Sequence, residues 1–183
     1  LAEAETTLAR ARTKFPGNPI IEGLSVGILA ARGDYAGADA YLRRIRGPQL
    51  GANDRTALAS LAVMRGKLAE AERDLDDGIE AQAARGAPQA AVEVATLAGA
   101  IDVWFRGAPR RGVRKVEAAL ARYPLAKMHP LDRPYLPLAS FYAIAGEPAR
   151  ARALVAAYES IDPALRRREE PAHHAALGAI ALA

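Results

Sequence analysis

Residues 135–151 read YLPLASFYAIAGEPARA, a sequence with the periodicity of two helices joined by a glycine turn. Large and small apolar residues alternate at helical spacing along one face of the first helix: Tyr135, Leu138, Ala139 and Tyr142. Gly146 then stops this helix, and Pro148 suits the first turn of the next one. Ala151 places a small residue where the second helix faces the first. The stretch therefore predicts a helical hairpin.

The same helix, glycine turn, helix pattern occurs four times in the chain. The turn glycines are Gly33, Gly66, Gly107 and Gly146. A small residue follows each glycine by five positions: Ala38, Ala71, Gly112 and Ala151. The intervals between the turns are 33, 41 and 39 residues. Periods of this size are typical of α-solenoids, in which stacked hairpins bury their apolar faces against each other.

This unit resembles the tetratricopeptide repeat (TPR). The positions that match its pattern best are Tyr135, Leu138, Ala139, Tyr142, Gly146, Ala151 and Pro163. Gly33-Asp34-Tyr35 matches the repeat's turn, and Pro16, Pro124 and Pro163 match its closing proline. The resemblance covers essentially the whole chain and implies an all-α, right-handed superhelix of about ten helices.

The chain also departs from the TPR pattern. Two of its intervals exceed the usual length, and Arg55 and Glu22 stand where a large apolar residue is common. Gly112 replaces the usual alanine. We expect one array with these approximate repeats: 1–18 (partial), 19–52, 53–88, 89–128, 132–165 and 170–183 (partial). Both ends stop inside a repeat, which predicts a piece of a longer protein.

Caps and breakers set the expected helix limits. We expect helices over 19–31, 35–45, 68–84 and 89–105. A further helix is expected to be capped by Asn53 or Asp54 and to end at Gly66, and another to run from Pro109 to Tyr123. The last three are expected to be one capped by Asp132 and ending at Gly146, one that begins at Pro148, and one that contains Leu177-Gly178.

The composition favours helices and excludes several kinds of site. Hydrophobic residues make up 51% of the chain but aromatic residues only 5%, with alanine filling most of the difference. With no cysteine, the chain has no disulfide, thiolate zinc site or cysteine nucleophile. The most apolar stretch, 90–105, is interrupted by Glu93 and Asp102, so it predicts a buried helix and not a membrane span. No signal peptide pattern is visible, and we expect a cytoplasmic location.

No catalytic, cofactor or metal site is predicted. The run from Gly107 to Gly112 has the glycine spacing of a phosphate loop, but it lacks the Lys-Ser/Thr pair that contacts phosphate and magnesium. Glu169 and Glu170 stand four residues before His173 and His174, a spacing that puts each pair on one helix face. A metal needs three or four convergent ligands, so a solvated helix start is the simpler interpretation.

The densest basic cluster has two interpretations. It contains Arg106, Arg110, Arg111, Arg114 and Lys115, with Arg150 and Arg152 one repeat later. The cluster could bind an acidic peptide or a phosphate backbone through charge-assisted hydrogen bonds. The plainer interpretation is a solubilising outer face, because most of these residues fall on second helices. The net charge of +4 is mild, and nucleic acid is the less favoured partner.

The TPR resemblance implies that the first helices line a concave groove. The residues that match groove positions are Thr56, Ser60, Met64, Leu97, Ile101, Trp104, Phe105, Leu136 and Ser140. Trp104 and Phe105 are the best candidate anchors for a partner. Alternatively, Trp104 fills the seam between adjacent repeats.

The expected function is a protein–protein interaction scaffold or sensor module that binds a peptide or protein in this groove. The long, Ala/Arg-rich repeats resemble the arms of large bacterial signalling proteins, such as serine/threonine kinases and multidomain transcriptional regulators. The alternative is therefore a non-catalytic regulatory region of a serine/threonine kinase. A third, weaker alternative is nucleic-acid binding through the arginine clusters.

Overall fold

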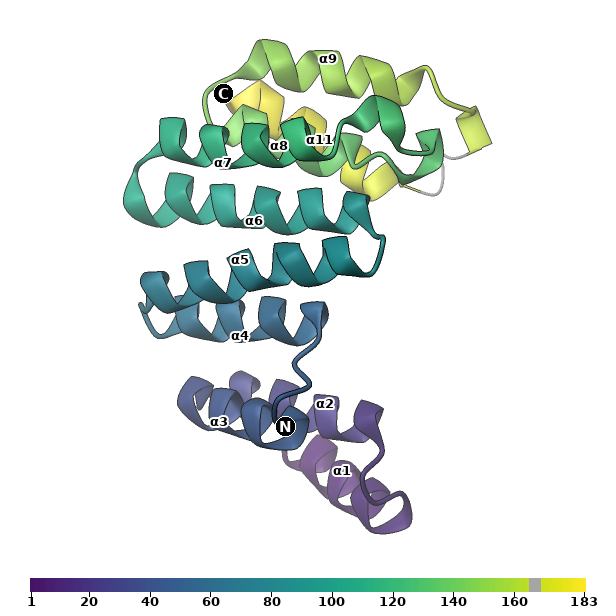
Figure 1. Cartoon of the computed structure of the whole chain (residues 1–183). Coiled ribbons are helices and arrows are strands. Elements are labelled where there is room, and N and C mark those ends of the chain that lie inside the picture. Colours follow the sequence, from purple (N-terminus) through teal and green to yellow (C-terminus); the bar gives the residue numbers. More distant parts are fainter. Residues whose placement is uncertain (165–168) are drawn as a thin grey trace. The chain divides into compact units, whose positions relative to one another are not determined.

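A computed structural model describes residues 1–164 and 169–183, and every regular element in these ranges is a helix (Figure 1). The predicted all-α class is confirmed for this part of the chain. The expected polar segment at 166–170 lies partly outside the described residues. The chain divides into two compact units, Leu1–Gly78 and Ile79–Ala183, and each is described by itself.

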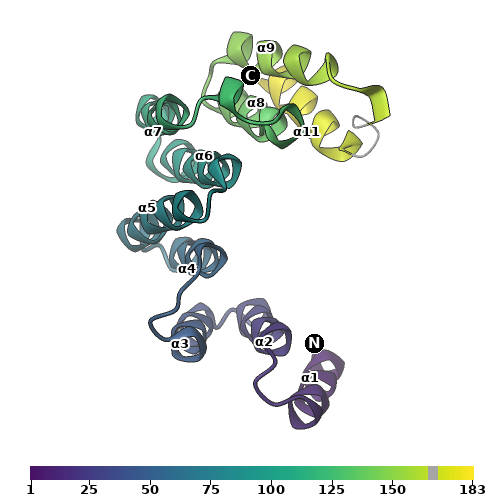
Figure 2. The same ribbon diagram turned by 45° about the vertical axis from the view of Figure 1, so that its right-hand side comes forward.

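The first unit is a run of helices in which each contacts the next. Its elements are α1 (Ala2–Lys14), α2 (Pro19–Ala31), α3 (Tyr35–Arg46), α4 (Ala52–Met64) and the first part of α5 (Leu68–Ala84). Contacts join α1 to α2, α2 to α3 and α3 to α4 (Figure 2). The turns at Gly33 and Gly66 have φ angles of +79° and +72°, a backbone conformation that glycine adopts without steric cost.

Local caps explain where these helices begin. The side chain of Asn18 accepts hydrogen bonds from the backbone N–H groups at the start of α2, and Asp34 accepts one from Gly37 at the start of α3. The predicted cap at Asn53 or Asp54 is wrong, because α4 begins earlier, after Gly51. Asp54 reaches back instead, and its carboxylate accepts a hydrogen bond from the Gly51 N–H at 2.9 Å.

An ionic network holds α3 against α5 within the first unit. Arg43 lies 3.1 Å from Asp39 on its own helix and 3.3 Å from Asp74 on α5. Arg65 lies 3.4 Å from Asp39 and 3.0 Å from Glu70. Burial raises the pKa of Asp74 even though Arg43 acts in the opposite direction. The ion pairs therefore offset only part of the cost of removing the Asp74 carboxylate from water.

The second unit consists of two helical hairpins and a further helix. Its elements are the end of α5, α6 (Pro88–Arg106), α7 (Pro109–Arg122), the short 3-10 helices η1 (Leu125–Lys127) and η2 (Pro130–Asp132), α8 (Tyr135–Ile144), α9 (Pro148–Glu159) and α11 (Glu170–Leu182). The hairpins are α6/α7 and α8/α9, and α11 packs on both α8 and α9 (Figures 1 and 2). Contacts between α6 and α8 join the two hairpins.

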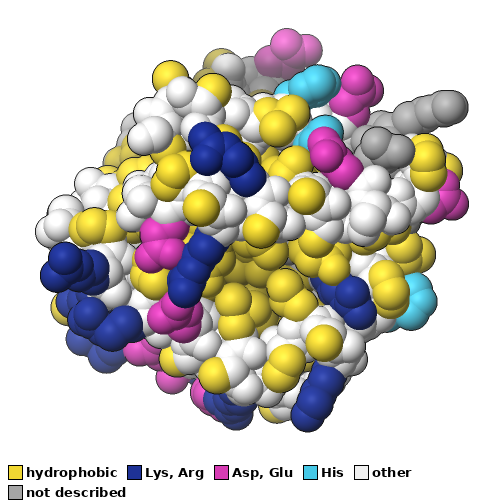
Figure 3. All heavy atoms as spheres, turned by 90° about the horizontal axis from the view of Figure 1, so that it is seen from above, with side chains coloured by type: hydrophobic (Ala, Val, Ile, Leu, Met, Phe, Trp, Pro, Cys, Tyr) yellow, Lys and Arg dark blue, Asp and Glu magenta, His cyan; other side chains and the backbone are white. Residues whose placement is uncertain are grey.

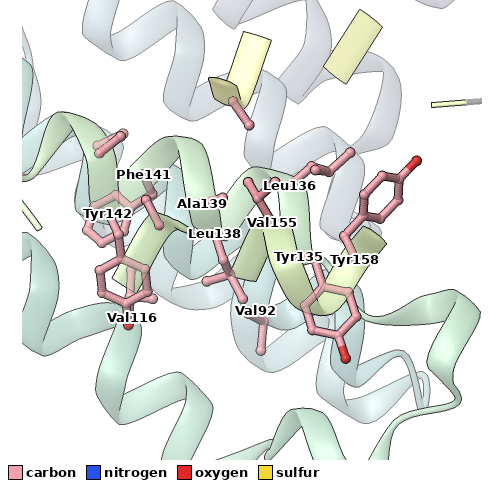
Figure 4. Packing of buried hydrophobic residues seen from close by; sticks show 14 of the residues in the cluster. Val92, Val116, Tyr135, Leu136, Leu138, Ala139, Phe141, Tyr142, Val155 and Tyr158 are labelled. Carbon is pink, nitrogen blue, oxygen red and sulfur yellow. The ribbon is translucent and has the colours of Figure 1, made fainter. Parts of the chain in front are cut away.

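Helix α8 is the centre of the second unit. Seven of its ten residues are buried, among them Leu138 and Phe141, because α6, α9 and α11 all contact it. Figure 4 shows Leu138 and Phe141 among the buried hydrophobic side chains around them. A helix that is apolar all round needs such cover. The predicted cap at Asp132 is wrong: Asp132 ends η2, and Pro134 takes the position before α8.

Helices α6 and α7 touch backbone to backbone at two glycines. A Cβ atom placed on Gly112 would lie 2.5 Å from the carbonyl oxygen of Gly99. A Cβ on Gly99 would meet both the Phe141 ring, at 2.8 Å, and the carbonyl oxygen of Gly112, at 3.0 Å. The departure from alanine at position 112 therefore has a steric cause, since even a methyl group does not fit there.

We expect Gly112→Ala to destabilise the second unit by at least about 2 kcal/mol, because the methyl group would overpack against rigid backbone. The matched control is Gly178→Ala on α11, where a Cβ meets nothing within 4 Å. This variant should gain about 0.5–1 kcal/mol from helix propensity. Thermal unfolding followed by circular dichroism measures both effects. Equal midpoints for the two variants would contradict the glycine contact.

Candidate functional site

Trp104 and Phe105 form an exposed aromatic pair at the C-terminal end of α6. Their exposed fractions are 62% and 55%. The helix continues for one more residue, and Gly107 then turns the chain into α7 with a φ angle of +59°. Trp104 therefore does not fill a seam: its side chain lies at the surface. Exposed large aromatic residues are typical of interaction sites.

Two of the predicted groove residues lie in the core instead. Ile101 is 5% exposed and Leu136 is 2% exposed, so neither side chain offers a surface to a partner. Leu136 is buried because α8 is covered on several sides. Leu97 and Ser140 are half-buried. Within the second unit, the accessible part of the predicted surface is therefore the end of α6.

The remaining predicted groove residues belong to the first unit. Met64 is exposed at the end of α4. The hydroxyl groups of Thr56 and Ser60 donate hydrogen bonds to the carbonyl oxygens one turn earlier in the same helix, at 3.1 and 3.0 Å. The hydrogen bonds of these two hydroxyl groups are therefore made within α4 itself.

The basic cluster surrounds the carboxylate of Asp102, which the sequence indicated only as an interruption of an apolar stretch. Asp102 on α6 is fully buried, and its carboxylate attracts three cations. Arg106 Nη1 lies 2.6 Å from Oδ1, Lys115 Nζ lies 2.9 Å from Oδ2, and Arg111 Nε lies 3.5 Å from Oδ2. Because two of these cations come from α7, the carboxylate also ties the two helices of the hairpin together.

The backbone of Asp102 takes part in the same turn. Its carbonyl oxygen accepts a hydrogen bond from the Ala108 N–H at 2.9 Å, which closes the end of α6 around Gly107. The expectation that the whole cluster is a solubilising outer face is therefore wrong for Arg106, Arg111 and Lys115. Arg110 and Arg114 are exposed.

Arg150, the basic residue one repeat later, also bridges two helices. Its guanidinium group lies 2.6 Å from Glu117 on α7 and 3.1 Å from Glu147 at the start of α9. It also lies over the Tyr142 ring, 5.3 Å from the ring centre. Figure 3 shows one face of the molecule, on which Lys and Arg side chains lie close to Asp and Glu side chains and to hydrophobic ones.

A hollow of about 580 Å³ lies at the other end of α6. Gln89 and Glu93 contribute to it from α6, and Glu169 contributes from the start of α11. The loop before α8 supplies Asp132 and Arg133. Closely packed protein atoms raise the pKa of Glu93, and the neighbouring Glu169 raises it further. The hollow thus concentrates negative charge.

The histidines pair differently from the expected spacing. His174 Nε2 lies 3.5 Å from Glu170, as the four-residue interval indicates. His173 Nε2 instead lies 2.9 Å from Glu159 on α9, and its ring packs against Tyr158. Among residues 1–164 and 169–183, no three His, Cys, Asp or Glu residues gather so that they could hold a metal ion.

None of the helices in the described part of the chain has the length and hydropathy that crossing a membrane requires. Comparisons with protein-family models, with curated proteins and with solved structures gave no match to this chain.

We expect Asp102→Asn to destabilise the α6/α7 hairpin by about 1–3 kcal/mol, because it removes the buried negative charge that attracts cations from both helices. The matched control is Glu117→Gln, which breaks the solvent-exposed pair with Arg150 and should cost less than about 1 kcal/mol. Urea unfolding measures both. A cost at position 102 no larger than that at position 117 would contradict a structural role for the buried carboxylate.

Replacing Glu93 should change how stability depends on pH. A raised pKa means that the folded protein disfavours the ionised form of the Glu93 carboxylate. The folding free energy that this group contributes is therefore fully present at pH values below 4.5, the usual pKa of glutamate. It is lost as the pH rises through the raised pKa of the folded protein. Glu93→Gln should therefore raise the unfolding temperature relative to the parent chain more at pH 7 than at pH 4. A gain that is the same at both pH values would rule out this assignment.

Proposed function

We propose that this chain is a non-enzymatic protein–protein interaction module, built as a TPR-like superhelix, that binds a peptide or protein segment through the end of α6. Trp104 and Phe105 act as the apolar anchors of this surface. The segment would lie along the accessible side of α6, where Leu97 is half-buried between the aromatic pair and the acidic hollow.

The exposure of Trp104 carries the proposal. It is the chain's single tryptophan, and 62% of it is exposed, although the helix that bears it is buried along much of its length. Exposing a large aromatic side chain forgoes about 2 kcal/mol of burial free energy. Tryptophan is also enriched among the residues that dominate binding energy at interfaces. A partner that covers the ring recovers this free energy.

The charges near the anchors favour a protein partner over nucleic acid. Asp102 attracts Arg106, Arg111 and Lys115, so these cations are partly neutralised within the fold. Arg110 and Arg114 remain exposed and can steer an acidic segment toward the aromatic pair. The resemblance in the repeat pattern supports a role as scaffold or sensor arm of a larger bacterial signalling protein.

A peptide selection tests the proposal. Random peptides displayed on phage are selected against the chain, and the affinity of the selected peptides is measured by calorimetry. Trp104→Ala should weaken binding about tenfold or more, since the loss of such an anchor typically costs about 2 kcal/mol. Binding should also shift the tryptophan emission to shorter wavelength, and this signal comes from Trp104 alone because the chain has one tryptophan.

The matched control is Leu182→Ala, which removes another exposed apolar side chain from the same unit. Its affinity for the selected peptides should stay unchanged, and both variants should keep the parent's helical circular dichroism. The proposal fails if Trp104→Ala binds as tightly as the parent chain, or if no peptide is selected.

A further inference from the structure

We infer that a second copy of this chain binds to the exposed apolar face of α1 and α2. A two-fold axis at right angles to the helices relates the two copies, so that each helix packs against its own counterpart in antiparallel orientation. This surface belongs to the first unit. The inference is therefore independent of the binding site proposed at the end of α6.

The α1/α2 face is hollowed, apolar and exposed. A hollow of about 590 Å³ lies between the two helices, which contact each other in the first unit (Figure 2). Its apolar lining residues are Leu1, Ala4, Leu8, Ala11, Leu24 and Ile28. On α2, Ile20 is 74% exposed and Leu24 is 57% exposed. The exposed positions of α2 carry no charge: Pro19, Ile20, Gly23, Leu24, Gly27 and Ala31. An exposed helix side of this kind is typical of an interface.

Two glycines of α2 are not required by packing within one copy. A Cβ atom on Gly23 or Gly27 would meet nothing within 4 Å. Glycine in the middle of a helix lowers its stability relative to alanine. Glycine also allows another helix to approach closely, as Gly99 and Gly112 do between α6 and α7. A helix of a second copy that packs on α2 gives the two exposed glycines such a role.

The charges of α1 match an antiparallel contact with its own counterpart. Glu3, Thr7, Arg10 and Lys14 follow each other at intervals of three or four residues, so they share one side of the helix. Glu3 and Thr7 line the hollow. Glu3 stands five residues before Leu8, and Lys14 stands six residues after it. A two-fold axis that crosses α1 near Leu8 therefore brings Glu3 of each copy to Lys14 of the other.

The same axis passes through the middle of α2. Two ion pairs, Glu5–Arg32 and Arg12–Glu22, show that α1 and α2 run antiparallel with their ends level. The middle of α2 is at residue 25, between its two exposed glycines. One rotation therefore places both helices on their counterparts, and the dimer is closed.

The size of the α1/α2 face sets the strength of the association. Each helix has 13 residues and is therefore about 20 Å long. Two such helices side by side, each about 10 Å wide, bury on the order of 1,000 Å² across both copies. This area is at the lower limit for a specific interface. We therefore expect a reversible dimer with a dissociation constant of roughly 10–100 μM.

Sedimentation equilibrium of the full chain, between about 1 and 500 μM, measures this association. Leu24→Glu should keep the chain monomeric, because the two new carboxylates would face each other near the axis in an apolar contact. The matched control is Leu182→Glu, the same change at an exposed residue of the second unit. It should dimerise as the parent chain does. Circular dichroism shows whether both variants are folded.

Charge reversal tests the antiparallel arrangement. Glu3→Lys places lysine at both ends of the α1 contact, and Lys14→Glu places glutamate at both ends. Each variant alone should therefore associate about fivefold more weakly than the parent chain. An equal mixture of the two variants places lysine opposite glutamate at both ends. The mixture should recover the parent's association as a heterodimer.

Three results would overturn the inference. The parent chain stays monomeric up to about 500 μM, or Leu24→Glu dimerises as the parent does while folded, or the mixture of Glu3→Lys and Lys14→Glu associates no more tightly than either variant alone. Each of these results leaves the peptide site at Trp104 unaffected, because that site lies in the other unit.

Discussion

The direct backbone contact between Gly99 and Gly112 sets the geometry of the second unit. Because neither residue has a side chain, α6 and α7 approach until a carbonyl oxygen of one helix occupies the space of a Cβ on the other. This close approach brings the cations of α7 within reach of Asp102 on α6. The missing Cβ of Gly99 also leaves room for the ring of Phe141 on α8. Both the close packing of α6 on α7 and the space for Phe141 therefore depend on glycine at position 99.

Asp102 has two opposite consequences for the basic cluster. Its buried carboxylate draws in Arg106, Arg111 and Lys115, which strengthens the hairpin and partly neutralises those cations. Arg110 and Arg114 stay exposed, close in sequence to the aromatic pair at the end of α6. The same short stretch thus combines residues that hold the fold with residues that are accessible to a partner.

Sequence reasoning predicted most of the helix limits because their signals are local. Asn18, Asp34 and Pro109 begin helices by capping or by fixing φ, and none of these effects requires a distant residue. The contacts that form the candidate sites are not local. The four-residue spacing between Asp102 and Arg106 is the one local indication of the ion pair that these two residues form. The approach of Lys115, and the meeting of Glu93 with Glu169, exist only once helices have packed.

The central position of α8 has a consequence for the synthesis of the protein. This helix is apolar on every side, and part of its cover comes from Ala176 and Ile180 on α11, about 40 residues further along the chain. A ribosome therefore releases α8 before the helix that completes its burial. During that interval the nascent chain exposes a strongly apolar surface that chaperones bind and that promotes aggregation.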